Sequence, residues 1–173
     1  MADAEALPLA DGSFTHILSV FGVVGAPRPE RAVAEMFRGC RPDGVVGLTA
    51  LPTGSYMAEL AHAIRGALSD ENVFADPERA WGSEEVVCSR LEPHASTVDV
   101  HRATLDWDPA VRSAAGRADC AGSYFAARVP EETLARIVDA RMAVESRFAA
   151  RSGRLLVEYM VVTARPRPVH RGG

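Results

Sequence analysis

The sequence predicts an α/β fold in which two parallel strands come first, an antiparallel pair comes last, and helices cover the faces of the sheet. Two observations carry this prediction. The first fifty residues alternate between short apolar runs and one amphipathic segment, and a strand–helix–strand unit ordinarily forms a right-handed crossover between parallel strands. The last fifty residues hold a long amphipathic segment, and the strongest β pattern of the chain follows it.

The first unit begins with residues 15–24, which are almost continuously apolar, as expected for a strand covered on both faces. Pro29 suits an early helical position, because its missing N–H is not needed there. One helical face is then marked by Val33, Met36, Phe37 and Cys40. Residues 41–44 are expected to end this helix, and residues 45–51 are predicted to form a second buried strand.

The middle of the chain is less regular. Apolar side chains at helical spacing predict a helix over residues 57–68, and residues 69–82 resemble a loop. Ser83 is expected to cap a short helix, because a hydroxyl at this position accepts from a free N–H group of the first turn. Glu84 and Glu85 follow at the end of the helix where the dipole favours acidic side chains.

The closing part of the chain is predicted to be strand, helix and strand. Residues 97–107 mix polar and apolar side chains in a strand-like pattern, and a long helix is predicted over 131–150. Residues 155–163 are rich in β-branched and aromatic side chains. We therefore expect one domain over residues 1–164, followed by a flexible tail of arginine and proline over 165–173.

Composition excludes several classes of function. All 19 basic residues are arginine, so no lysine can form a Schiff base, bind phosphates in a Walker motif or act as a general base. The net charge of −4 opposes nucleic-acid binding. The apolar runs are interrupted well before the roughly 20 residues that a membrane span needs. With three widely separated cysteines and no secretory leader, a cytoplasmic protein with reduced thiols is expected.

Four segments carry a resemblance to a known family. Residues 3–14 run from Asp-Ala-Glu directly toward the apolar stretch 17–22. Residues 35–44 end in Arg-Pro-Asp-Gly, and residues 81–85 read Trp-Gly-Ser-Glu-Glu. In this order they resemble the C-terminal half of a class I S-adenosylmethionine-dependent methyltransferase of type 11, which has a Rossmann-like fold. The resemblance implies methyl transfer from S-adenosylmethionine to a small molecule.

The resemblance also implies which residues bind the cofactor. Asp3 would accept a hydrogen bond from the adenine amino group, and Ala4 and Glu5 would line the edge of the ring. Near the methionine and ribose end of the cofactor would lie Ser19, Val20 and Phe21. The resemblance assigns no catalytic residue and no metal ligand.

Half of the family's pattern has no counterpart in this sequence. The glycine-rich turn lets backbone approach a cofactor at a helix N-terminus, yet no Gly-x-Gly occurs here. We therefore expect weak or absent S-adenosylmethionine binding by this chain alone, and an N-terminal half that is missing or supplied by a partner. Residues 16–22 would then form an apolar sheet edge, which favours self-association or pairing with a separate protein that carries that half.

Other interpretations remain open. The chain is alternatively a non-catalytic remnant that serves as a dimerisation or small-molecule-binding module, or a piece of a longer enzyme. Cys88, His94 and His101 match no zinc spacing, and His94 is either a loop side chain or a general base. Arg38 and Arg41 are interpreted as cations that suit a helix end. A lid over an apolar substrate, or plain packing on the sheet, would explain Met57, Leu60, Ile64 and Trp81.

Overall fold

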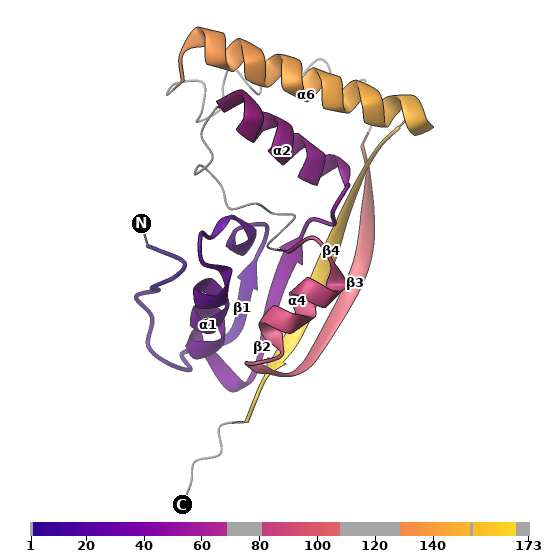
Figure 1. Ribbon diagram of the computed structural model, residues 1–173. Helices are drawn as coiled ribbons and strands as arrows, with labels where there is room; N and C mark the ends of the chain where they lie inside the picture. Colours follow the sequence, from indigo (N-terminus) through magenta and orange to yellow (C-terminus); the bar gives the residue numbers. More distant parts are fainter. Residues whose placement is uncertain (1, 69–80, 108–128, 153, 169–173) are drawn as a thin grey trace, which may run out of the picture. The chain divides into compact units, whose positions relative to one another are not determined.

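The computed structural model describes residues 2–68, 81–107, 129–152 and 154–168. Its elements are β1 (Phe14–Ser19), the 3-10 helix η1 (Val23–Gly25), α1 (Pro29–Gly39), β2 (Cys40–Ala50), α2 (Tyr56–Leu68), α4 (Glu84–Leu91), β3 (Ala95–Trp107), α6 (Glu131–Ser152) and β4 (Leu155–Pro166) (Figure 1). The chain divides into two compact units. The first comprises Met1–Thr53, Phe74–Ala103 and Tyr159–Gly173, and the second comprises Gly54–Val73 and Thr104–Glu158.

The four strands form one mixed sheet in the order β1-β2-β4-β3. β1 and β2 are parallel, and β4 is antiparallel to β2. The N–H of Arg167 donates to the carbonyl of His94 at 2.8 Å, so the end of β4 lies beside the start of β3 and these two strands are antiparallel as well. This confirms the predicted fold class, with two parallel strands followed by an antiparallel pair.

Helix α1 begins with Pro29 at its first turn, as predicted, and its buried face includes Val33, Met36 and Phe37. It ends at Gly39, and β2 starts at the next residue. The turn-like residues 41–44 therefore lie inside the strand rather than between helix and strand.

The pairing register explains this difference from the prediction. Phe14 pairs with Cys40, whereas His16 already pairs with Val45, so residues 41–44 form an irregular insertion in β2. Gly44 fits this insertion because a Cβ there would lie 2.6 Å from the Cys40 Sγ atom and 2.6 Å from the carbonyl oxygen of Thr15. Turn-forming residues thus mark a bulge in β2.

The first unit has one apolar core. It includes the helix face of α1, the inward side chains of β2 and β4, and the completely buried Trp81. Figure 1 shows α1 and α4 on the same side of the sheet. Helix α4 is capped as predicted, since Ser83 Oγ accepts from the N–H of Val86 at 3.2 Å. Trp81 therefore packs in this core, in agreement with the packing interpretation.

The second unit is built around α2 and α6. Leu60 is buried in its core, and Met57 and Ile64 pack against that core, so these side chains also follow the packing interpretation. Tyr56 donates from its hydroxyl to Glu145 at 3.0 Å, and its ring meets that of Phe148 edge to face. Within the described residues, no helix is long and apolar enough to cross a membrane.

Predicted boundaries were close for the later elements. Helix α2 matches the expected range almost residue for residue, and α6 and β3 each extend two residues beyond theirs. β4 continues to Pro166, so the first two residues of the expected tail belong to a strand. The loop predicted over residues 69–82 lies outside the described residues except at its end.

Candidate functional site

The residues implied by the resemblance lie in two places in the first unit. Asp3, Ala4 and Glu5 belong to the segment before β1, and Asp3 and Ala4 are exposed. The carbonyl of Asp3 accepts from the N–H of Ala6 at 3.1 Å, which closes a turn. Asp3 Oδ1 also accepts from the N–H of Glu5 at 2.9 Å. The turn fixes the position of the Asp3 carboxylate, although that carboxylate faces solvent.

Glu5 has a structural role that the sequence did not indicate. Its side chain is buried, with 9% of the residue exposed. Its carboxylate accepts from the N–H of Arg28 at 2.8 Å and forms an ion pair with the Arg28 guanidinium. Because Arg28 directly precedes α1, Glu5 ties the N-terminal segment to the start of that helix.

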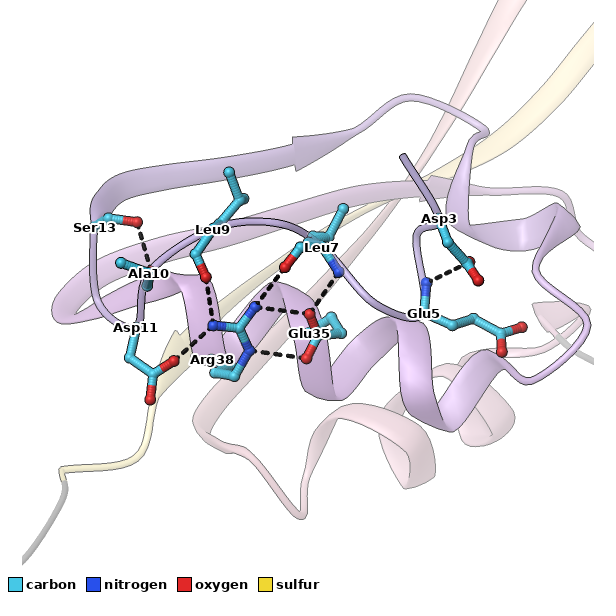
Figure 2. Close-up of polar contacts among 9 residues, drawn as sticks. All are labelled: Asp3, Glu5, Leu7, Leu9, Ala10, Asp11, Ser13, Glu35 and Arg38. Carbon is cyan, nitrogen blue, oxygen red and sulfur yellow. Dashed lines mark hydrogen bonds and ion pairs between the residues drawn. The ribbon is translucent and has the colours of Figure 1, made fainter. Parts of the chain in front are cut away.

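Two side chains of α1 hold the rest of the N-terminal segment, as Figure 2 shows. Glu35 accepts from the N–H of Leu7 at 2.8 Å. Arg38 donates to the carbonyl oxygens of Leu9 and Leu7 at 2.7 and 3.0 Å, and to the Asp11 carboxylate at 2.6 Å. These bonds satisfy backbone groups in a segment without regular structure. We call these two α1 residues the Glu35–Arg38 pair.

The Glu35–Arg38 pair is itself bidentate. The Arg38 guanidinium donates to both carboxylate oxygens of Glu35, each at 2.8 Å. These hydrogen bonds from Arg38, followed by the one from the Leu7 N–H, lower the pKa of Glu35 to about 2. Glu35 and Asp11 in turn raise the pKa of Arg38. Both side chains therefore stay charged across the physiological range.

The sequence does not reveal this role. Its pattern indicates Arg38 only as a cation that suits the end of α1, and Glu35 only as part of a motif. The available signal was the spacing of three residues, which brings an acid and an arginine onto one helical face. Their contacts with residues 7–11 could not be predicted, because they join positions about thirty residues apart in the chain.

The second group follows β1, at the carboxyl ends of the parallel strands. Ser19 Oγ accepts from the N–H of Val23 at 2.8 Å, and the N–H of Phe21 donates to Thr49 Oγ1 at 2.8 Å. Phe21 adopts a left-handed backbone with φ of 53°. Such a conformation costs a residue other than glycine on the order of 1–3 kcal/mol. It also ends β1 earlier than the sequence predicted.

The side chains of this turn are open to solvent. Val20 is 75% exposed and Phe21 is 41% exposed. The Phe21 ring meets that of Tyr159 edge to face, with 6.3 Å between ring centroids. Leu18, in the last part of β1, is 71% exposed. An apolar surface therefore borders the carboxyl end of β1, where the resemblance places the methionine and ribose end of the cofactor.

A groove of about 890 Å³ lies at the opposite end of the parallel strands. Among its lining residues are Asp11, Arg41, Asp43 and His94. Arg41 and Asp43 pair with each other at 3.3 Å, and Asp11 pairs with the guanidinium of Arg38. Arg167 also lines the groove, so its lining holds three arginines against two aspartates and carries a net positive charge.

His94 lines that groove, and its ring stacks on Phe37 with 5.5 Å between ring centroids. The groove lies at the amino end of β2, away from Ser19, Val20 and Phe21. This position supports the interpretation of His94 as a plain loop side chain. In the described part of the chain, no three metal-ligating side chains gather.

Comparison with known proteins agrees with this architecture. Residues 1–48 match a family model described as a methyltransferase domain. Among solved structures, the YcgJ protein of Bacillus subtilis matches with a TM-score of 0.57 and 14% identity, over 95% of this chain and 69% of that one. A phosphoethanolamine N-methyltransferase 2 of Haemonchus contortus matches with a TM-score of 0.55 and 12% identity, over 97% of this chain and 37% of that one.

The chain has part of the α/β fold that is seen in S-adenosylmethionine-dependent methyltransferases. Its curated relatives are longer. An uncharacterized protein of Mycobacterium tuberculosis (strain H37Rv) is 37% identical over 108 residues, which are 62% of this chain and 39% of that protein. The C-methyltransferase UbiE of ubiquinone and menaquinone biosynthesis from Methylobacterium nodulans is 52% identical over 42 residues, which are 24% of this chain and 17% of that enzyme. Matches thus span about two fifths, or less, of these relatives.

Proposed function

We propose that this chain is the adenine-side part of an S-adenosylmethionine-dependent methyltransferase that acts on a small molecule. The observation that carries the proposal is the anchored N-terminal segment. Glu5 and the Glu35–Arg38 pair fix residues 5–11 to α1, while Asp3 and Ala4 remain exposed. The Asp3 carboxylate accepts from the Glu5 N–H through Oδ1, and its second oxygen can accept from an exocyclic amine, which is the contact that the family resemblance assigns to it.

Methyl transfer depends little on general acid–base catalysis. An enzyme gains rate mainly by aligning the sulfonium methyl with the accepting atom, since a positioned pair of reactants reacts far faster than two free ones. Within this proposal, Asp3 and Ala4 orient the adenine, and Ser19, Val20 and Phe21 border the reacting end. No residue is assigned as a catalytic base.

The proposal includes completion by another polypeptide segment. β1 is terminal in the strand order, and the curated relatives are longer than this chain. We infer that a second polypeptide pairs with β1, which forms the first part of the expected edge 16–22 and ends at Ser19, and brings the glycine-rich turn. A separate N-terminal-half protein, or the N-terminal part of a longer form of this chain, would meet this requirement, and self-association would cover the edge without supplying the turn.

Calorimetric titration with S-adenosylhomocysteine tests this function. The chain alone should show no measurable binding. Co-expression with the N-terminal part of the Mycobacterium tuberculosis relative should give binding that Asp3→Asn weakens at least tenfold. Asp99→Asn, in which an exposed carboxylate on β3 is neutralised, serves as the matched control and should leave affinity unchanged. Equal affinity of the Asp3 variant and the wild type would refute the adenine contact.

A non-catalytic remnant is the second candidate, and the exposed apolar side chains of β1 favour it. Such a remnant would self-associate through residues 16–22 and would not bind S-adenosylhomocysteine in any combination. Gel filtration beside the titration separates the two candidates. A dimer that never gains cofactor binding supports the remnant, whereas a complex with the N-terminal part that binds cofactor supports the enzyme.

A further inference from the structure

Phe21 combines two features that rarely occur together. Its backbone has a positive φ of 53°, a region that glycine tolerates and bulky residues avoid. The residue is nevertheless 41% exposed, so burial of its side chain offsets only part of that backbone cost. Strained residues that their surroundings hold in place tend to occur at ligand-contacting positions.

The surroundings do hold Phe21 in place. Its N–H donates to Thr49 Oγ1 at 2.8 Å. Ser19 and Val23 flank it by two residues each, and the Ser19 hydroxyl accepts from the N–H of Val23 at 2.8 Å. The ring is further oriented by its edge-to-face contact with Tyr159, at an interplanar angle of 74°. The ring is therefore presented in a defined direction before any ligand arrives.

We propose that the Phe21–Tyr159 pair binds the flat, unsaturated ring of the methyl acceptor. This inference rests on the function proposed above, because it makes the acceptor the molecule that contacts the carboxyl end of β1. Perpendicular aromatic rings offer a third flat ring both a face and an edge, which are the two favourable arrangements for aromatic contact. Exposed Val20 and Leu18 extend the apolar surface on the side of β1.

Charge at this position favours a neutral ring over an ionic ligand. Residues 19–23 contain no ionisable side chain. Thr49, which accepts a hydrogen bond from the turn, is not ionisable either. A carboxylate or phosphate group would find no arginine in the turn to pair with. A quaternary ammonium group is the competing occupant, because cations also bind the faces of aromatic rings.

Binding of 2-naphthol by the full chain tests the proposal without any cofactor. Saturation-transfer difference NMR should show contact with the wild-type chain. Phe21→Gly should bind at least tenfold more weakly while its Tm stays equal or rises, since glycine relieves the backbone strain. Phe21→Leu, which keeps apolar bulk but has no flat ring, should show the same loss. Leu105→Ala, the matched control, removes an exposed apolar side chain on β3 rather than β1 and should stay within twofold of the wild type.

Three results would overturn the proposal. These are no detectable 2-naphthol binding by the wild type, an equal loss in Leu105→Ala, and displacement of 2-naphthol by tetramethylammonium at equal concentration. The experiment is independent of the titration with S-adenosylhomocysteine. A chain that binds 2-naphthol through Phe21, but whose completed form never binds the cofactor, would retain the ring site and refute the methyltransferase function.

Discussion

Replacing Glu35 by glutamine should detach the N-terminal segment from α1. The pKa of Glu35 falls from an ordinary 4.5 to about 2 in the folded chain, and one unit of pKa is worth about 1.4 kcal/mol, so the full effect is about 3 kcal/mol. Arg38 is 30% exposed and Glu35 is 18% exposed, which lets solvent screen part of the attraction. We therefore expect Glu35→Gln to lower the free energy of unfolding by about 2 kcal/mol.

The same variant should change how stability depends on pH. Because the folded pKa of Glu35 lies below the unfolded one, its contribution is fully present above pH 4.5 and is lost as the pH falls toward about 2. As the pH falls through this window, protonation of Glu35 alone should lower the free energy of unfolding of the wild type by about 2 kcal/mol. Glu35→Gln removes the titrating carboxyl, so its loss of stability between these pH values should be smaller by that amount.

Two measurements check this reasoning. Urea unfolding at pH 7 and pH 2 gives the free energies. Hydrogen exchange of the Leu7 N–H, which donates to Glu35, reports the segment directly and should accelerate. Glu84→Gln is the control, since Glu84 forms a single exposed ion pair with Arg102 and should cost no more than about 0.5 kcal/mol. If the two variants lose equal stability and Leu7 exchange is unchanged, the anchoring role of Glu35 is wrong.

The remaining predictions concern packing and capping. Gly44→Ala should cost about 2 kcal/mol, since its Cβ would meet the backbone oxygen of Thr15 at 2.6 Å. Gly47→Ala should change the free energy of unfolding by no more than about 0.5 kcal/mol, because the nearest atom to its Cβ would be the flexible, exposed end of Leu18 at 2.8 Å. Urea unfolding midpoints compare the two variants. Equal losses of stability would contradict the bulge at Gly44. Ser83→Ala should cost about 1 kcal/mol through loss of the α4 cap, and an unchanged Tm would refute that cap.

Local patterns predicted most of the secondary structure. The helix from Pro29 and the capped helix after Ser83 were recognisable because their signals lie within a few residues. Two of the differences came from long-range effects. β1 ends early because Phe21 turns left-handed with its N–H bonded to Thr49, and residues 41–44 enter β2 because pairing with β1 extends that strand to Cys40.

The candidate site was predictable only in part. A linear motif could indicate Asp3 and Phe21, since the resemblance rests on neighbouring residues. Burial of Glu5 against Arg28 could not be predicted, because the two residues are 23 positions apart. The motif around Glu5 does not indicate a partner before α1, and the sequence around Arg28 does not indicate a buried acid. The motif therefore indicates the segment, whereas the contacts that anchor it join residues far apart in the sequence.

The two edges of the sheet differ in how they are protected, and this difference bears on the proposed partner. β3, at one end of the strand order, carries Asp99, Arg102 and Asp106, and charged side chains discourage pairing with another chain. β1, at the other end, reads Phe-Thr-His-Ile-Leu-Ser and carries no carboxylate, arginine or proline. When charged side chains protect one edge of a sheet and the other edge is an apolar strand, we expect another polypeptide segment to cover the apolar edge. This asymmetry is why we place the completing segment at β1 rather than at β3.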